Sequence, residues 1–177
     1  MPRSSPDSLL IGEWACLGIL CAGPRHGFAV AARLRPDADL GRIWSMSRAL
    51  TYRSLDQLVE RGLVAERRHE PGVAGGTRTI LGATRHGRIA FRRWVTSPVE
   101  HVRDLRSELL LKVVLADETE TDIRKMLDAQ HGRLSTLVAN LEGQRTDTDV
   151  VHDWRCEAAT AALRFVERCI DRADPAA

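Results

Sequence analysis

A helix followed by two short extended segments, within residues 47–81, constrains the fold of this chain more than any other feature. Ser47 is suited to begin the helix, because its hydroxyl can accept a hydrogen bond from a backbone N–H group that has no partner at a helix start. Apolar residues then recur at steps of three or four up to Arg61, which predicts one apolar face. Gly62 tolerates the left-handed backbone that often ends a helix. The predicted apolar face consists of Ala49, Tyr52, Leu55, Leu58 and Val59.

The two extended segments predict a β-hairpin. Residues 63–69 and 77–81 are its strands, and the turn at residues 71–76 begins with proline and is rich in glycine. This turn is longer than a tight two-residue hairpin loop. The hairpin is basic, since its strands carry Arg67, Arg68, His69 and Arg78.

A helix followed by a basic hairpin is typical of a winged helix that reads DNA. Arginine can form two hydrogen bonds with guanine in the major groove, and any arginine can neutralise a phosphate. The predicted polar face of the helix consists of Arg48, Thr51, Arg53, Ser54, Gln57 and Arg61. An ordinary amphipathic helix with a solvated face explains the helix alone equally well, and the basic hairpin favours the DNA reader.

The charge of the chain is unevenly distributed. Residues 1–95 contain 15 Arg against 8 acidic residues, a net charge of +7, whereas residues 96–177 contain 11 basic and 16 acidic residues, a net charge of −5. This indicates a domain that binds a polyanion, joined to one that does not. The excess of Arg over Lys also fits a compositional bias, but such a bias would not sort acidic residues to one end.

Length and composition are those of a globular protein of one or two domains, with 177 residues of which 44% are hydrophobic and 28% charged. The longest apolar run, residues 9–22, contains Gly12 and Glu13 and is too short to cross a membrane. The chain begins without the basic cluster and cleavage region of a signal peptide. We therefore expect a cytoplasmic protein.

The sequence lacks the common motifs of catalysis and metal binding. Residues 72–76 are rich in glycine but lack the Lys-Ser/Thr pair of a phosphate-binding loop. The six histidines are scattered, and the cysteines have no zinc-ligand spacing. We therefore expect no enzyme activity, no metal and no cofactor. A structural role is expected for Cys16, Cys21, Cys156 and Cys169.

Three further helices are predicted in the first half of the chain. The first follows a disordered tail, begins with a cap at Asp7 or Ser8, and ends before Gly23-Pro24. The second spans residues 26–34, and Thr84 caps the third, residues 85–96. The predicted inward residues of this third helix are Ile89, Ala90, Trp94 and Val95. Residues 8–97 are thus predicted to form a winged helix-turn-helix domain, and the whole chain to be mainly α with a small β-hairpin wing.

The remaining residues, 98–177, predict a second, helical domain. A connecting helix spans residues 102–116 and packs under the winged domain, and the acidic run at 117–120 caps a long helix that ends near Gln144. A turn at residues 143–148 precedes a last helix. The predicted apolar stripe of this last helix consists of Val151, Trp154, Ala158, Ala161, Phe165 and Cys169.

Two long amphipathic helices need a further surface to bury both apolar stripes. A second copy of the chain would supply that surface. An intramolecular bundle is the alternative. The residues expected at the dimer interface are Ile123, Leu127, Leu134, Leu141, Trp154 and Phe165.

Three blocks of sequence, taken together, resemble the PadR family of transcriptional regulators. They are Gly18-Ile19-Leu20 with Gly23-Pro24-Arg25-His26-Gly27-Phe28, then Tyr52, Leu55 and Leu58 with Gly62-Leu63-Val64, then Thr84-Arg85-His86-Gly87-Arg88. The blocks span about residues 9–95 and follow the family's order. The chain departs from the family's common pattern at Ala49, where Gly is common, and at Ile80, where Tyr is common.

The resemblance implies a homodimeric winged-helix regulator, usually a repressor, which would pair with a palindromic operator. It places Tyr52 on the family's recognition-helix tyrosine, a frequent contact with phosphate or base. It places His26 at the start of the second helix, where backbone amides could face phosphate. The residues expected to contact DNA are His26, Ser47, Arg48, Thr51, Tyr52, Arg53, Arg67, Arg68, Thr77 and Arg78. The alternative is a winged-helix module that binds a protein partner instead of DNA.

The tryptophans lead to one further expectation. Trp14, Trp94 and Trp154 are on helices that flank the expected junction of the two domains, and a flat ligand can stack on indole. Members of the PadR family often respond to phenolic or multi-ring compounds. We therefore expect a small aromatic effector that binds there and weakens DNA binding. The alternative is that the tryptophans are ordinary core residues.

Overall fold

The structure, a computed structural model, describes residues 9–71, 77–144 and 149–173. The predicted tail and helix cap within residues 1–8 and most of the two predicted turns lie outside these residues. Within the described part of the chain, no helix is both long enough and apolar enough to span a membrane.

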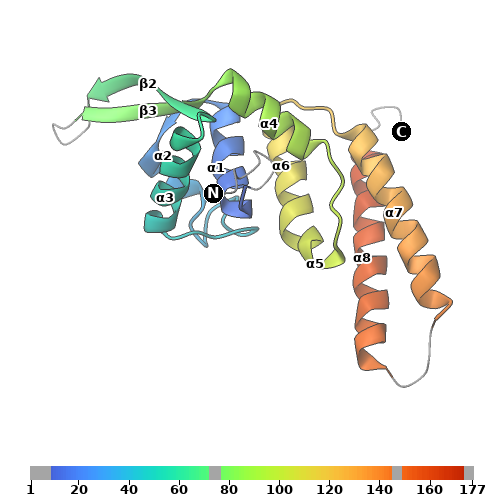
Figure 1. The fold of residues 1–177 in the computed structure, drawn as a ribbon. Helices are drawn as coiled ribbons and strands as arrows, with labels where there is room; N and C mark the ends of the chain where they lie inside the picture. The colour runs from blue at the N-terminus through green and yellow to red at the C-terminus, as the bar shows by residue number, and fades with distance from the viewer. Residues whose placement is uncertain (1–8, 72–76, 145–148, 174–177) are drawn as a thin grey trace, which may run out of the picture. The chain divides into compact units, whose positions relative to one another are not determined.

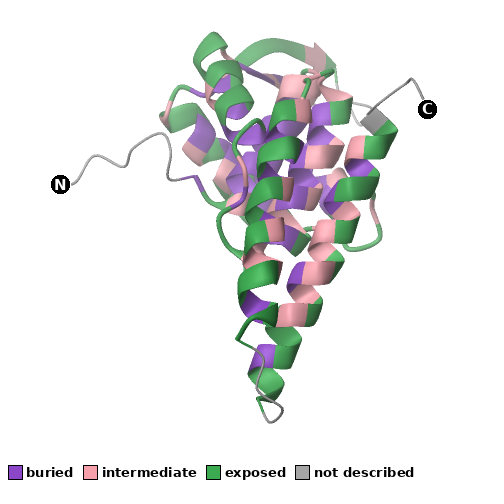
Figure 2. Ribbon diagram, turned by 90° about the vertical axis from the view of Figure 1, so that its right-hand side faces the viewer, coloured by how far each residue is buried: buried purple, intermediate pink, exposed green. Residues whose placement is uncertain are grey.

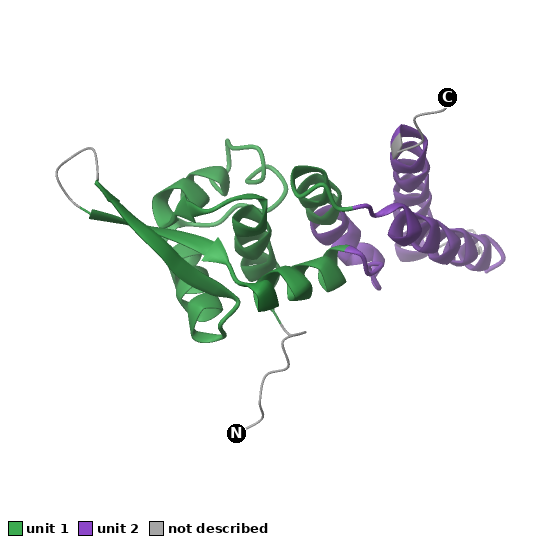
Figure 3. Cartoon of the chain, turned by 90° about the horizontal axis from the view of Figure 1, so that it is seen from above, with its two compact units in different colours: residues 1–95, 110–121 green, residues 96–109, 122–177 purple. Residues whose placement is uncertain are grey.

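The chain divides into two compact units (Figure 3). The first unit contains Met1–Val95 and Leu110–Thr121, and the second contains Thr96–Leu109 and Asp122–Ala177. The division differs from a single cut after residue 97, because residues 110–121 return to the first unit.

The first unit is a winged helix-turn-helix (Figure 1). Its strands form one antiparallel sheet in the order β1-β3-β2, in which β2 and β3 are the predicted hairpin, here called the wing. The predicted fold class, mainly α with a small hairpin wing, is confirmed. Strand β1 was not predicted, because two residues carry no periodic signal. The elements of this unit are α1 (Ile11–Ala22), β1 (Arg25–His26), α2 (Gly27–Arg33), α3 (Arg48–Glu60), β2 (Val64–Pro71), β3 (Thr77–Ala83), α4 (Arg85–Val95) and α6 (Leu110–Glu118).

Helix α1 is the central element of the first unit. Every residue from Gly12 to Leu20 is buried, and α1 contacts α3, α4, α6 and β3. The buried carboxylate of Glu13 accepts a hydrogen bond from the backbone N–H of Leu10 at 2.7 Å. This bond satisfies both the acid and one of the unpaired N–H groups of the helix start. The helix ends at Ala22, just before Gly23-Pro24, as predicted.

Helix α3 turns a different face to the core from the one predicted. Leu55 and Leu58 are buried as expected, but Thr51 is buried with them, while Tyr52 and Val59 are 37% and 41% exposed. Burial of Thr51 leaves no polar atom unpaired, because its hydroxyl donates a hydrogen bond to the carbonyl of Ser47 at 3.0 Å. The prediction that Thr51 faces solvent is therefore wrong.

The predicted caps at Ser47 and Thr84 are confirmed. The Ser47 hydroxyl accepts a hydrogen bond from the N–H of Leu50 at 3.2 Å, and the Thr84 hydroxyl accepts one from the N–H of Gly87 at 3.0 Å. Gly62 has a φ of +67°, which glycine adopts without strain.

On α4 one predicted core residue faces outward. Ile89 is exposed, whereas Phe91 and Trp94 are buried. Ile89 is an apolar residue among the arginines of the exposed side of α4, and the aromatic side chains fill the core.

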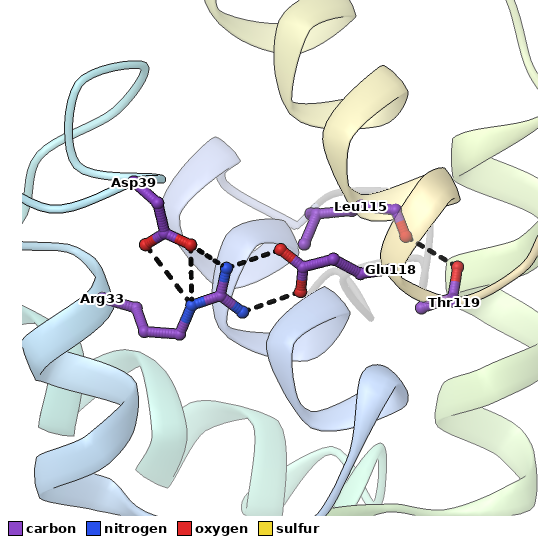
Figure 4. Close-up of polar contacts among 5 residues, drawn as sticks. All are labelled: Arg33, Asp39, Leu115, Glu118 and Thr119. Atoms are coloured by element: carbon purple, nitrogen blue, oxygen red, sulfur yellow. Dashed lines mark hydrogen bonds and ion pairs between the residues drawn. The ribbon is translucent and has the colours of Figure 1, made fainter.

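Helix α6 contacts α1 and α4, as expected for a connecting helix that packs under the winged domain. Near its end, Glu118 pairs with Arg33 of α2 at 2.5 Å, and Arg33 also pairs with Asp39 in the loop after α2 (Figure 4). The acidic run at residues 117–120 thus ends α6 and does not cap the next helix, which corrects the prediction. That helix begins at Arg124, whose N–H donates to the Asp122 carboxylate at 2.8 Å.

The second unit is built on two long helices that pack along each other, α7 (Arg124–Glu142) and α8 (Val150–Ala173) (Figure 1). They follow α5 (Val102–Asp104) and the π-helical turn η1 (Leu105–Leu109). The Gln130 side chain accepts a hydrogen bond from the N–H of Val99 at 2.7 Å and donates one to its carbonyl at 3.3 Å. The imidazole of His152 bonds the carbonyl of Leu141 at 2.9 Å, which joins α8 to α7.

Helix α8 is rotated relative to the prediction. Exposed residues, green in Figure 2, run along it and include Val151, Trp154 and Ala161 of the predicted inward stripe. Cys169 of the predicted stripe is buried as expected, and the other buried side chains are those of His152, Ala159 and Val166. Small Ala159 allows close approach of the two helices, and His152 finds a partner there, so this stripe faces α7 although it is less apolar.

The ion pairs of Arg33 predict a pH-dependent contribution to stability. Hydrogen bonds to Glu118 and Asp39 raise the pKa of Arg33 despite its partial burial. Partial burial would raise the pKa of Asp39, but its hydrogen bonds, chiefly the one from Arg33, outweigh this and the pKa is lowered. A carboxylate with a lowered pKa stabilises the fold above its unfolded pKa, and this stabilisation is lost as the pH falls through the folded pKa.

We therefore expect an Asp39→Asn variant to lose less unfolding free energy than the parent as the pH falls from about 5 to about 2. Urea unfolding at each pH measures this. Asp37→Asn is the matched control, because Asp37 forms an exposed ion pair with Arg35; it should follow the parent. Equal slopes for parent and Asp39→Asn would contradict the prediction.

Candidate nucleic-acid interface

The N-terminal half of α3 forms one side of the candidate interface. Ser47, Arg48, Leu50 and Arg53 are all exposed there, as expected for all but Leu50. The first turn of α3 contains no acidic residue. Within the described residues, neither Arg48 nor Arg53 pairs with a carboxylate, so both guanidinium groups are available to an anion or a base edge.

Two aromatic rings lie against Arg48. Its guanidinium carbon is 5.3 Å from the ring centroid of Phe28 and 5.6 Å from that of Tyr52, within the range of a cation–π contact. The Tyr52 ring also lies against Gly27, where a Cβ atom would come within 3.0 Å of it. Phe28 was not predicted as a site residue. An apolar residue one position after the start of a short helix gave no signal that it would be exposed.

His26 has a structural role at the start of α2. Its Nδ1 accepts a hydrogen bond from the N–H of Ala29 at 3.0 Å, so the side chain caps the helix. The His26 ring also stacks on Phe28, with 6.3 Å between centroids. One of the amides expected to face phosphate is therefore already bonded within the chain.

The wing forms the other side of the interface, and its arginines differ in what they contact. Arg67 lies at a bulge in β2, folds back over Gly82 and donates a hydrogen bond to the carbonyl of Ala83. Arg68 pairs with Glu70 at 2.7 Å. Arg78 is exposed at the start of β3, next to exposed Thr77. One N–H donor of Arg67 thus braces the sheet, while the residue is exposed, so its expected contact with phosphate stays a prediction.

Between α3 and the wing lies a groove of about 830 Å³. It brings together five of the ten residues expected to contact DNA. Its charged residues are mixed, because Asp56, Glu60 and Glu66 line it together with Arg48 and Arg78. The full lining is His26, Gly27, Phe28, Arg48, Tyr52, Leu55, Asp56, Val59, Glu60, Glu66, Thr77, Arg78, Thr79 and Leu81.

The tryptophans expected to hold an effector do not offer open ring faces in the first unit. Trp14 and Trp94 stack on each other, with 5.0 Å between centroids and 6° between planes, and are 7% and 8% exposed. The buried ammonium of Lys112 lies 5.1 Å from the Trp94 ring centroid. The prediction that Trp14 and Trp94 bind a ligand is therefore wrong, because each indole already stacks on the other. Trp154 lies in the second unit and is 73% exposed.

Burial also determines the state of the cysteines of α1. It raises the pKa of Cys16 and that of Cys21 to about 12. Both thiols therefore stay protonated at neutral pH, and neither is poised to act as a nucleophile.

The residues expected at a dimer interface divide into two groups. Leu127, Leu134 and Leu141 are buried within the chain itself, on α7, so they are not available to a partner. Their prediction as interface residues is wrong, because α8 of the same chain packs along α7. The partly exposed and exposed residues of the set are Ile123, Trp154 and Phe165.

No family model matches the chain, and a search of curated proteins finds none that is similar to it. Among solved structures, the chain is similar to Bacillus subtilis PadR in complex with operator DNA, with 16% identity and a TM-score of 0.47 over 89% of this chain and 97% of that one. It is similar to a PadR-like transcriptional regulator from Bacillus cereus, with 20% identity and a TM-score of 0.41 over 91% and 96%. It is also similar to the Vibrio cholerae virulence activator AphA, with 18% identity and a TM-score of 0.40 over 94% and 99%.

The bond from Arg67 to Ala83 predicts a local effect on the wing. We expect Arg67→Ala to weaken the pairing of β2 with β3 by about 0.5–1.5 kcal/mol, the usual net value of one hydrogen bond. Amide hydrogen exchange of residues 80–83 should become faster by a corresponding factor. Arg68→Ala is the matched control, since an exposed ion pair contributes little. Equal protection in the two variants would contradict a bracing role for Arg67.

Proposed function

We propose that this chain is a DNA-binding transcriptional regulator and not an enzyme. The observation that carries the proposal is the exposed N-terminal half of α3, which presents Arg48 and Arg53 beside a wing that contributes Arg78. A helix fits the width of the major groove, where arginine can bond guanine edges, and a wing arginine can hold phosphate. The sequence blocks that resemble the PadR family support the same function independently.

In the proposed complex, α3 enters the major groove and the wing follows the backbone next to it. Arg48 and Arg53 contact base edges or phosphates, Tyr52 borders the same surface, and Arg78 contacts phosphate. Asp56 adds a possible base contact, because a carboxylate can accept a hydrogen bond from the amino group of cytosine. Thr51 does not take part, since its side chain is buried.

A second function is favoured by one observation, the carboxylates of the groove. Asp56, Glu60 and Glu66 would attract a basic peptide, so the winged helix could serve a protein partner instead of DNA. The salt dependence of DNA binding separates the two functions. Affinity for DNA that falls steeply with salt supports the regulator, and no measurable affinity for DNA supports the peptide-binding module.

We further propose that the regulator is a homodimer joined through α8. Val150, Val151 and Trp154 form an exposed apolar cluster near the start of this helix, and such clusters often mark interfaces. A two-fold dimer pairs naturally with a palindromic operator whose half-sites are about one DNA turn apart. Occupying such an operator would make the protein a repressor where the site overlaps a promoter.

We also propose that a small aromatic effector weakens DNA binding, on the ground of the resemblance to the PadR family. The second unit offers it an open groove of about 480 Å³, where Val102, Leu105 and Leu137 supply apolar surface and Arg133 a positive charge. A panel of phenolic and multi-ring compounds tests the proposal. If no compound both binds the protein and lowers its DNA affinity, the effector is to be dropped.

Phosphate contact by Arg78 predicts a change in salt dependence. The logarithm of the DNA association constant falls linearly with the logarithm of salt concentration, with a slope near the number of phosphates neutralised. We expect Arg78→Ala to bind every sequence more weakly and to reduce the slope by about one. Arg35→Ala removes the same charge from a residue that does not line the groove, and it should keep the parent's slope. An unchanged slope in Arg78→Ala would contradict the contact.

The proposed dimer predicts distinct effects of substitutions on α8 and α7. Trp154→Glu should yield folded monomers, because it places a charge in the interface, whereas Trp154→Phe should stay dimeric. Leu134→Glu should unfold the second unit instead, since Leu134 is buried within the chain. Sedimentation at about ten micromolar and circular dichroism separate these outcomes. A monomeric parent protein would contradict the dimer.

A further inference from the structure

Arg48 occupies a position that local electrostatics disfavour. It is the first residue of α3, where the helix carries partial positive charge and where acidic residues are preferred. Within the described residues, no carboxylate compensates this charge. Local rules of stability are most often broken at functional sites. The placement of Arg48 therefore calls for an explanation beyond the stability of α3.

The two rings beside Arg48 hold it without using its hydrogen-bond donors. Phe28 and Tyr52 lie 5.3 and 5.6 Å from the guanidinium carbon. A cation–π contact involves the charge of the group and needs no acceptor atom, so the N–H donors stay available for another partner. An ion pair with a carboxylate would instead have occupied them.

The Phe28 side chain is not part of the buried core. It is 56% exposed, although it follows directly on Gly27 at the start of α2. Its neighbours in the structure are the His26 ring and Arg48. The Tyr52 ring lies close to Gly27, at the start of α2. The two rings thus connect Arg48 to the start of α2, so the guanidinium is anchored to both helices of the helix-turn-helix.

We infer that Phe28 is a positioning residue which, with Tyr52, orients Arg48 to read a guanine in the major groove. The inference rests on the proposed function and adds to it the residue that determines specificity at one base. Guanine offers two acceptors, O6 and N7, to the fork of an arginine. An arginine that is already held loses less conformational freedom on binding, which favours the base that bonds both donors.

The assignment is tested by the ratio of affinities for two duplexes. The first carries the best site selected from a random pool. The second differs from it at the guanine whose replacement lowers the affinity of the parent but leaves that of an Arg48→Ala variant unchanged. Phe28→Leu keeps an apolar side chain but removes the ring, and Phe28→Tyr keeps the ring. Because Phe28 is exposed, both variants should fold like the parent.

We expect Phe28→Leu to lower this ratio by about three- to fivefold, the effect of losing one exposed cation–π contact. The salt slope should not change, because no charge is removed. Phe28→Tyr should keep the ratio of the parent. In an Arg48→Ala background, Phe28→Leu should have no further effect, because Phe28 acts through Arg48.

Several results would overturn the assignment. An equal loss with and without Arg48 would mean that Phe28 contacts DNA itself, and no loss in either background would mean that the ring is irrelevant. If Phe28→Leu does not fold, the contact is tested by NMR of the parent protein without DNA. Ring currents of Phe28 and Tyr52 should shift the Arg48 side-chain proton resonances upfield, and unshifted resonances would contradict the contact. If Arg48→Ala discriminates bases as the parent does while Arg78→Ala loses affinity, the assignment fails and the proposed function stands. A parent that does not bind DNA removes both.

Discussion

The burial of α1 on all sides determines where the surface elements of the first unit can lie. Because Gly12–Leu20 are enclosed, α3, α4, α6 and β3 must each turn a face toward this helix. For α3 that face is the stripe of Thr51, Leu55 and Leu58. Arg53 lies on the opposite side of α3, and Arg48 is exposed at the first turn of the helix, where it lines the groove next to the wing. The candidate DNA surface is therefore a consequence of how the core is filled.

The arginines of the first unit differ in the contacts they make within the chain. Arg33 is committed to Glu118 and Asp39, Arg67 to the carbonyl of Ala83, and Arg68 to Glu70. Arg48 and Arg78 reach the groove without such partners among the described residues. The count of 24 Arg in the sequence does not tell arginines with an internal partner from those without one. In the proposed function, a few available guanidinium groups carry the recognition while others hold the domain together.

Local signals in the sequence predict several caps and ends of the helices correctly. Ser47, Thr84, Gly62 and Gly23-Pro24 act through atoms within a few residues, so their chemistry can be read without the fold. The choice of buried face was less predictable. On α8 two stripes recur at helical spacing, and only packing against α7 decides between them. The roles of Arg67 and Phe28 depend on a sheet bulge and on an interhelical contact, which no periodicity encodes.

The central claim is that the exposed side of α3 and the wing bind DNA while the second unit does not contact it. Mapping amide and side-chain resonance shifts of the labelled protein, as a duplex containing the selected site is added, tests this most directly. Large shifts are expected at Arg48, Arg53 and Arg78, and small shifts along α7. Shifts confined to the second unit, or no shifts at a salt concentration of about 50 mM, where electrostatic binding is strong, would contradict it.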